Sequence, residues 1–360
     1  MPSKMMLNTV KRRILALSTK RKTRVLVVED SMVFRELLVR GISADLGIEV
    51  VATASDPYMA RDKIIEFEPD VMTLDIELPR MNGIDFLRRL MPQYPIPVVV
   101  VSAVSSNVFE ALGAGAVDFV TKPSPNAGRS IESFINELII KIKIASTAKV
   151  GHWKSDSSFN RYTGSKNDDI DKKVIAIGAS TGGTEATFEV IKAFPRDMPG
   201  TIIVQHMPPV FTKMYAERLN NTCMMEVKEA QSGDKVIPGR VLIAPGEHHM
   251  KIKKTGSIYT VECFKGEKVN GHCPSVDVMF DSVAEAAGRN AIGVILTGMG
   301  QDGARGLLNM RGKGARTIGQ DEESSVVYGM PKVAFEVGAV EKQASIQNIA
   351  KVIFNMLNMS

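Results

Sequence analysis

Cysteine is scarce in this sequence, and long hydrophobic runs are missing from it. The cysteines Cys223, Cys263 and Cys273 form no C-x-x-C pair, so neither a disulfide framework nor a zinc knuckle is predicted. So few thiols without a pairing pattern fit a reducing cytoplasm. The apolar runs, such as Val98–Val101 with its flanks, are far shorter than the roughly 18 residues that a membrane span requires, so we expect no membrane insertion.

An excess of positive charge is also lacking over most of the chain. The formal net charge is +5, but residues 1–22 contain seven lysines and arginines and no acid, which leaves −2 on the remainder. With no basic excess and no clear helix-turn-helix pattern there, we expect no nucleic-acid partner. The apolar stretch within residues 1–22 is too short for a signal peptide. We interpret these residues as a disordered basic extension, and a transit peptide is the less favoured interpretation.

The length and composition predict two soluble domains. A chain of 360 residues, 44% hydrophobic and 24% charged, exceeds one ordinary core. We divide it into the extension 1–22, a first domain 23–144, a linker 145–172 and a second domain 173–360. The linker is polar and aperiodic, which is typical of a flexible tether, although it contains the only tryptophan, Trp153.

Runs rich in β-branched residues alternate with helical patterns in the first domain. This alternation predicts an α/β fold with a doubly wound parallel sheet. The expected strands are Val25–Val28, Val50–Thr53, Val71–Leu74, Val98–Val101 and Val117–Val120.

Polar residues stand where several of these strands end. Glu29 and Asp30 follow the first strand, Asp75 the third, Ser102 the fourth, and Lys122 lies just beyond the fifth. Because the carboxyl ends of parallel strands share one edge, the three carboxylates would repel one another unless a cation lay among them. Oxygen ligands of this kind suit Mg²⁺. The alternative is that these residues are merely solvated at loop starts. That interpretation is reasonable for any one of them but poor for all five at equivalent edge positions.

These residues, together with the stretch Asp75–Gly83 and Lys122-Pro123, resemble the two-component receiver domain over residues 24–143. The resemblance implies a flavodoxin-like fold in which Asp75 accepts a phosphoryl group while Glu29 and Asp30 help to hold Mg²⁺. The implied switch residues are Ser102, Phe119 and Lys122. Glu29 stands where the family more often has a second aspartate.

The second domain begins with an apolar strand, Val174–Ile177, that runs into Gly-Ala-Ser-Thr-Gly-Gly and then a helical pattern. This order places Ser180 at the carboxyl end of a strand, where the free N–H groups of the next helix favour negative charge. A tetrahedral oxyanion would suit that position. A phosphate-binding turn is the alternative, but a Walker loop has Lys and then Ser or Thr after its last glycine, and here Thr184 and Glu185 follow.

Two further strand ends carry titratable residues. His206 follows the expected strand Thr201–Val204, and Asp302 follows Ile292–Leu296. Serine, histidine and aspartate at three strand-to-helix turns of one sheet can meet in the geometry that acyl transfer requires. His272 and Cys273 are adjacent, and neighbours in sequence rarely form the hydrogen bond of a base and its nucleophile. For His272 we expect a surface or substrate-loop role.

The segment around Asp302 also fits a dinucleotide-binding pattern. Gly298, Gly300 and Gly303 match G-x-G-x-x-G, and Asp321 stands where a ribose-binding acid would lie. Asp302 would place negative charge at the pyrophosphate position, and only 57 residues follow Gly303, too few for the usual second half of that fold. A dinucleotide-binding domain is therefore the alternative interpretation.

The motifs around Ser180, His206 and Asp302, with Ile-Ala-Pro-Gly-Glu-His-His-Met and Pro-Ser-Val-Asp between them, resemble the catalytic domain of the chemotaxis protein-glutamate methylesterase family. The resemblance implies a Rossmann-like α/β hydrolase domain with Ser180 as nucleophile, His206 as base and Asp302 as its orienting acid. It also implies the Met299 backbone amide as an oxyanion donor.

With a receiver in front, the resemblance implies a phosphorylation-activated serine hydrolase that adapts chemotaxis. It would demethylate glutamate γ-methyl esters on chemoreceptors and deamidate receptor glutamines to glutamate, with no cofactor for hydrolysis. The implied partners are methyl-accepting chemoreceptors as substrate and the chemotaxis sensor histidine kinase as phosphodonor. A response regulator with a non-catalytic output domain remains the other class of function.

Overall fold

The computed structural model describes residues 21–103, 107–123, 130–151 and 172–358. The chain divides into two compact units between Thr147 and Ala148. Nearly all of the predicted N-terminal extension, and Trp153 with most of the predicted linker, lie outside the described residues. At the start of that linker, the Lys149 N–H donates to the carbonyl oxygen of Val326 at 2.9 Å, so this residue is bound to the second unit.

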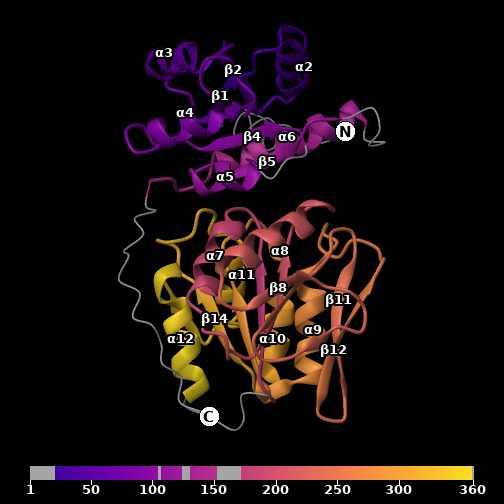
Figure 1. Cartoon of the computed structure of the whole chain (residues 1–360). Coiled ribbons are helices and arrows are strands. Elements are labelled where there is room, and N and C mark those ends of the chain that lie inside the picture. The colour runs from indigo at the N-terminus through magenta and orange to yellow at the C-terminus, as the bar shows by residue number, and fades with distance from the viewer. Residues whose placement is uncertain (1–20, 104–106, 124–129, 152–171, 359–360) are drawn as a thin grey trace, which may run out of the picture. The chain divides into compact units, whose positions relative to one another are not determined.

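The first unit is a parallel five-stranded sheet in the order β2-β1-β3-β4-β5, with helices on both faces (Figure 1). Helices α2 and α6 pack together, and α4 contacts both α3 and α5. The strands are β1 (Thr23–Val28), β2 (Ile48–Ala54), β3 (Val71–Leu74), β4 (Val98–Ser102) and β5 (Asp118–Thr121). The helices are α2 (Met32–Ser43), α3 (Pro57–Phe67), α4 (Gly83–Leu90), α5 (Asn107–Gly113) and α6 (Ile131–Ala145).

Local chemistry explains where these elements begin. Strands β3 and β4 are buried along their whole length, which is why their sequences are mostly apolar. The side chains of Ser31, Asp56, Asn82 and Ser130 accept hydrogen bonds from the first turns of α2, α3, α4 and α6. The predicted doubly wound, flavodoxin-like fold of this unit is confirmed.

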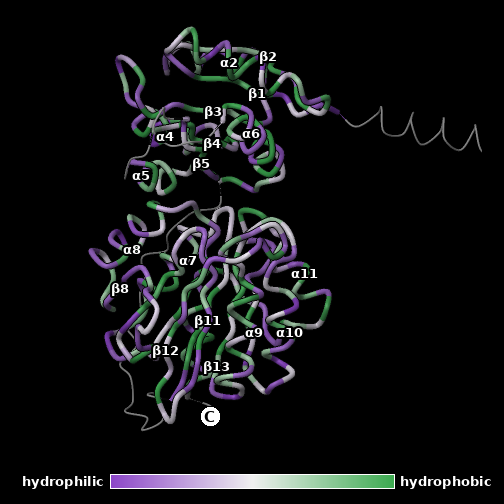
Figure 2. The backbone as a smooth tube through the Cα atoms, turned by 90° about the vertical axis from the view of Figure 1, so that its right-hand side faces the viewer, coloured by the Kyte–Doolittle hydropathy of each residue, from purple (hydrophilic) through white to green (hydrophobic). Residues whose placement is uncertain are grey.

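The second unit has a parallel seven-stranded sheet in the order β15-β14-β13-β6-β7-β10-β8 and an antiparallel sheet β11-β12-β9. The strands of the larger sheet are β6 (Val174–Ala179), β7 (Gly200–Gln205), β8 (Glu226–Glu229), β10 (Arg240–Ile243), β13 (Ala291–Ile295), β14 (Arg316–Gln320) and β15 (Lys342–Ala344). Those of the smaller sheet are β9 (Lys235–Val236), β11 (His249–Thr255) and β12 (Ile258–Phe264). In Figure 2 the hydrophobic colour follows the central strands of this unit, such as β13.

Helices cover both faces of the larger sheet. They are α7 (Gly183–Lys192), α8 (Phe211–Thr222), α9 (Val276–Ala286), α10 (Ala304–Gly312), α11 (Met330–Glu336) and α12 (Ile346–Asn358), with a short 3-10 turn at Gly288–Asn290. Helix α9 packs against α10 and α11 follows α10 on that face, whereas α7 contacts α8 and α12. Among the described residues, no helix is long and apolar enough to cross a membrane.

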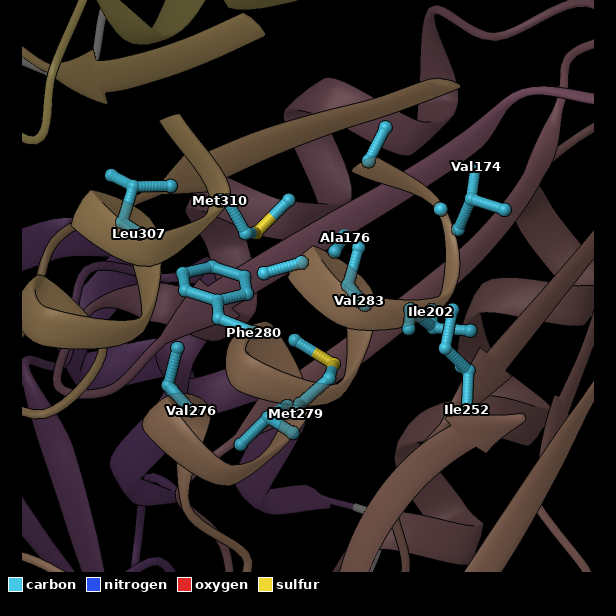
Figure 3. Packing of buried hydrophobic residues seen from close by; sticks show 14 of the residues in the cluster. Val174, Ala176, Ile202, Ile252, Val276, Met279, Phe280, Val283, Leu307 and Met310 are labelled. Carbon is cyan, nitrogen blue, oxygen red and sulfur yellow. The ribbon is translucent and has the colours of Figure 1, made fainter. Parts of the chain in front are cut away.

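The core beneath α9 fixes the position of the strand that carries Ser180. Phe280 of α9 faces Leu307 and Met310 of α10 (Figure 3). A Cβ atom on Gly178 of β6 would overlap Val276 Cγ1, so α9 approaches the strand more closely than any side chain would permit. The β6 strand is therefore held at the centre of the sheet by direct packing of helix on backbone.

Chain order reverses beside a central strand in each unit. In the second unit, β6 lies between β7, which follows it, and β13. In the first unit, β1 lies between β2 and β3 in the same way. In open α/β sheets ligands bind at the carboxyl ends of the strands at such a reversal. The predicted Ser180, His206 and Asp302 of the second unit follow strands at one of these points. The predicted Glu29, Asp30 and Asp75 of the first unit follow strands at the other.

Candidate active site and phosphoryl-acceptor site

Ser180 follows β6 in a turn that bonds its backbone on both sides. Its N–H donates to the Thr297 carbonyl at 3.0 Å, and its own carbonyl accepts from the Gln205 side-chain amide at 2.8 Å and from the Gly183 N–H at 2.7 Å. Gly182 has φ 75°, a left-handed conformation that glycine adopts without strain, and α7 begins directly after it. The half-buried serine thus stands before the N-terminus of a ten-residue helix.

His206 follows β7, the strand beside β6. Gln205 pairs in register with Ala179, and the His206 N–H donates to the Ala179 carbonyl at 3.2 Å, so histidine and serine leave adjacent strands at the same level. His206 Nε2 lies 2.9 Å from Asp302 Oδ2. The side chain of His206 is 7% exposed, and within the described residues its buried Nδ1 has no hydrogen-bond partner.

Asp302 is held by a set of donors from one segment of chain. Its Oδ1 and Oδ2 accept hydrogen bonds from Asn270 Nδ2 (3.0 Å), Ser275 Oγ (2.8 Å), Val276 N (2.7 Å) and Asp277 N (3.2 Å), besides His206. Burial alone would raise the pKa of Asp302, but the hydrogen bond and charge of His206 and the other side-chain bonds hold it well below its usual range.

This ionised carboxylate determines which nitrogen of His206 is basic. Because Asp302 can only accept, His206 Nε2 must carry the proton of their shared hydrogen bond. In neutral imidazole the other nitrogen then has a free lone pair. His206 Nδ1, buried and unpartnered among the described residues, is that atom. The arrangement can take a proton from a group placed at the end of β6.

The predicted phosphoryl-acceptor residues also meet at a strand edge. Ligand atoms of Glu29, Asp30 and Asp75 lie within 4.8 Å of one another. Lys122 Nζ lies 2.6 Å from Asp75 Oδ2 and 2.9 Å from Glu29 Oε2, and both carboxylates are buried. Ser102, buried at the end of β4, accepts the Lys122 N–H at its carbonyl.

The electrostatics of this cluster favour a cation. Burial and the neighbouring charge of Asp75 raise the pKa of Glu29, although Lys122 opposes them. Burial alone would lower the pKa of Lys122, but its bonds to Asp75 and Glu29 outweigh that effect and raise it. Lys122 thus pairs with two of the three carboxylates, and hard oxygen donors left with surplus negative charge suit Mg²⁺.

Comparison with known proteins matches both units. The CheB methylesterase profile matches residues 175–353, and the response regulator receiver domain profile matches residues 25–131. The chain is 62% identical over 338 residues to protein-glutamate methylesterase/protein-glutamine glutaminase 2 of Syntrophomonas wolfei, which covers 94% of this chain and 98% of the relative. The chain belongs to the CheB methylesterase family.

Two other similar proteins agree with this assignment. The protein-glutamate methylesterase/protein-glutamine glutaminase of Syntrophotalea carbinolica is 53% identical over 351 residues, with 94% of this chain and 98% of that relative covered. The crystal structure of the Thermotoga maritima CheB methylesterase catalytic domain is 38% identical, has a TM-score of 0.50, and covers 51% of this chain and 98% of its own. The resemblance read from the motifs is confirmed, and so is the α/β fold of the catalytic unit.

Within this CheB methylesterase fold, Met299 lies beside the serine turn. A Cβ atom on Gly298 would come within 2.7 Å of Ser180 Cβ, so the residue before Met299 packs directly against the serine. Gly298 is fixed by bonds from its N–H to the Val327 carbonyl at 3.0 Å and from the Met330 N–H to its own carbonyl at 2.7 Å. In the described part of the chain, nothing accepts a hydrogen bond from the Met299 N–H. That amide is available for an oxyanion.

The dinucleotide pattern in the same segment has a structural explanation. A Cβ atom on Gly303 would meet Val276 of α9, and Gly298 packs on Ser180, so both glycines serve close packing. Asp302 is 1% exposed and bonded to His206, and Asp321 Oδ1 accepts from the Ser324 N–H and hydroxyl at 2.9 and 2.7 Å. These contacts and the family assignment exclude the alternative.

The donors around Asp302 and the surroundings of His272 were not foreseen from the sequence. His272 stacks on His206 with ring centroids 3.7 Å apart and planes 7° apart, a contact that the expected surface or substrate-loop role did not include. Burial and the nearby His206 lower the pKa of His272 to about 4. The only available signal was the density of polar residues just before and at the start of α9, namely Asn270, His272, Ser275 and Asp277.

Proposed function

We propose that Ser180, His206 and Asp302 form the catalytic triad of a protein-glutamate methylesterase/protein-glutamine glutaminase that acts on chemoreceptors. The observation that carries the proposal is the state of His206. Its Nε2 is bonded to an ionised, buried carboxylate, while its Nδ1 is buried without a partner among the described residues, one strand away from Ser180. A buried imidazole nitrogen with no structural partner is costly unless it serves chemistry.

In the proposed reaction Ser180 Oγ attacks the ester carbonyl of a methylated glutamate as its proton passes to His206 Nδ1. Asp302 then faces an imidazolium and stabilises it through the Nε2–H bond. The Met299 N–H and the first turn of α7 would stabilise the oxyanion. His206 returns its proton to the departing methoxide, methanol leaves, and a water activated by the same nitrogen releases the glutamate. A glutamine side chain would release ammonia by the same steps.

For the receiver we propose that Asp75 accepts a phosphoryl group from the chemotaxis sensor histidine kinase, in the cytoplasm. Glu29, Asp30 and Asp75 would hold Mg²⁺, which when bound neutralises charge on the transferring phosphoryl group. Lys122 Nζ, now bonded to Asp75 Oδ2, is within reach of phosphoryl oxygens on that atom. Ser102 would contact the same oxygens, and Phe119, which is buried, would change position with the Ser102 loop.

The test is methanol release from methylated receptor by the full-length protein and its Ser180→Ala variant. We expect activity to be abolished in Ser180→Ala while the thermal unfolding profile is unchanged. The matched control is Ser257→Ala, at the exposed turn between β11 and β12, which should behave as the wild type. If Ser180→Ala retains more than about a tenth of the activity, Ser180 is not the nucleophile.

A further inference from the structure

The loop between β12 and α9, residues 265–275, contacts the proposed base and its acid at the same time. Its His272 ring lies nearly parallel to the His206 ring, with centroids 3.7 Å apart. Its Asn270 side-chain amide bridges two carboxylates, donating to Asp302 Oδ1 at 3.0 Å and to Asp277 Oδ2 at 2.8 Å. No role proposed above requires the His272 ring.

His206 has a particular need for such a contact. Its Nδ1 is left free for Ser180, so among the described residues a single side-chain hydrogen bond, from Nε2 to Asp302, orients the ring. A ring held at one atom can still swivel about that bond, which would turn Nδ1 away from the serine. The parallel His272 ring blocks this movement because any tilt of the imidazole drives it into a second ring at van der Waals distance.

The loop is itself fixed by another buried histidine at the start of β11. His249 Nδ1 accepts the Ser275 N–H at 3.2 Å, and its Nε2 lies 2.8 Å from the Glu267 carbonyl oxygen. Since Nδ1 accepts, Nε2 carries the proton and donates to Glu267. His249 is only 3% exposed, so its imidazole is held rigidly. Its two hydrogen bonds join the two ends of the loop, at Glu267 and Ser275. Between these ends, Val269 and His272 exchange two backbone hydrogen bonds of 3.0 Å.

We propose that the 265–275 loop positions the catalytic base, with His272 fixing the plane of the His206 ring and His249 fixing the loop. Both are positioning residues, since the contacts from which we argue are to the His206 ring and to the loop backbone. The inference rests on the proposed function, in which His206 Nδ1 takes the proton of Ser180. It assigns to two histidines outside the triad a specific effect on turnover.

The first experiment compares His272→Ala and His272→Phe in the full-length protein with methylated receptor as substrate. We expect His272→Ala to lower kcat by about tenfold to a hundredfold with KM changed by less than about twofold, because a misplaced base loses turnover and not substrate affinity. His272→Phe keeps a flat ring on His206 and should restore kcat to within about threefold of the wild type. A KM effect in place of a kcat effect would make His272 a substrate contact and overturn the proposal.

A spectroscopic measurement separates positioning from general stabilisation. In the wild type the His206 ring protons lie over the face of His272 and are shielded, so in protein with isotopically labelled histidine they should move downfield in His272→Ala and not in the control His248→Ala. His248 is half-buried, its Nδ1 lies 3.1 Å from the Gly246 carbonyl oxygen, and among the described residues its ring is not part of the His206–His272 stack. Unmoved His206 signals in a folded His272→Ala protein would contradict the stack. If His272→Ala does not fold, a kcat of His272→Phe lowered tenfold or more would contradict it.

His249→Phe tests the anchor. This change keeps a ring of similar volume but removes both hydrogen bonds, so kcat should fall with little change in KM and the His206 signals should shift as in His272→Ala. The Ser180→Ala result keeps the two proposals distinct. If Ser180→Ala is inactive while both histidine variants turn over like the wild type, the triad stands and the positioning loop is wrong. If Ser180→Ala is active, the proposed function itself fails.

Discussion

At the scale of single residues, Asp302 is where most polar contacts of the active site converge. In Asp302→Asn one oxygen becomes an NH₂ group that must face donors such as Val276 N or Ser275 Oγ. We expect a loss of about 1–3 kcal/mol of unfolding free energy from this unpaired buried group, together with an activity loss smaller than that of Ser180→Ala, because the acid orients the base without forming a bond to substrate. Calorimetry and methanol release measure the two effects.

The control for this change is Asp281→Asn. Asp281 also has two side-chain partners, Arg305 and Asn309, but it lies near the surface on α9. Asp281→Asn should therefore leave the unfolding free energy and the rate of methanol release nearly unchanged. An Asp302→Asn protein as stable and as active as Asp281→Asn would show that Asp302 neither supports the loop nor orients His206.

His272 gives a prediction about pH. Its pKa is lowered to about 4 in the folded protein from an ordinary value of 6.5, so between these values the unfolded chain binds a proton that the folded chain does not. The contribution of His272 to the free energy of unfolding is therefore fully present above pH 6.5 and is lost as the pH falls toward 4. The free energy of unfolding in urea should therefore fall more on acidification across this pH window for the wild type than for His272→Phe. Parallel pH profiles for the two proteins would contradict the lowered pKa of the half-buried His272.

At the scale of elements, the contact between β6 and α9 predicts opposite outcomes for two Gly→Ala changes. In Gly178→Ala the new methyl group overlaps Val276 Cγ1, so strand and helix must separate, at a cost of about 1–3 kcal/mol. In Gly312→Ala, at the end of α10, nothing lies within 4 Å of the new Cβ, and we expect stabilisation by up to about 1 kcal/mol. Chemical denaturation of both variants measures the sign of each change in unfolding free energy. Equal changes for the two variants would contradict the close approach of α9 to β6.

The same elements show what could be read from the sequence. Buried parallel strands such as β4 and β6 are apolar runs rich in β-branched residues, so the two parallel sheets and the strand ends that carry Ser180, His206 and Asp75 were predictable. The antiparallel sheet was not predicted as a unit, because β11 carries exposed lysines and β9 pairs with β12, a strand distant from it in the sequence. Contacts between side chains, such as His272 on His206, depend on how a loop returns over the sheet, and no spacing in the sequence encodes that path.

At the scale of the whole molecule, a phosphoryl-accepting unit and a hydrolase share one chain. A tethered unit has a high effective concentration near its neighbour, so a weak interface is enough for inhibition. Phosphorylation of Asp75 adds roughly −1 to −2 of charge beside Lys122 and would loosen such an interface. We predict that removing residues 1–144 raises basal methylesterase activity, that a small-molecule phosphodonor activates the intact protein, and that Asp75→Asn abolishes this activation.

Three methanol-release assays run in parallel decide this prediction. A shift of about 1.4 kcal/mol in the docking equilibrium changes the open fraction about tenfold while the docked form dominates, so the expected activation is of that order. If the protein without residues 1–144 is folded but no faster than the unphosphorylated full-length protein, the receiver acts by stimulation and not by inhibition. If Asp75→Asn still responds to the phosphodonor, phosphorylation occurs elsewhere.

The close packing of glycines around the serine turn has a consequence for mutational scanning. Gly298 packs on Ser180, and Gly303, which follows Asp302, packs on Val276, so a side chain at either position displaces the packing beside the triad. In a library of single substitutions selected for receptor demethylation, these positions should be depleted as strongly as the triad. A parallel selection for protein abundance separates the two groups, since Ser180 variants survive it and the glycine variants do not. Intolerance to substitution would, on its own, make this active site look much larger than the few residues that react.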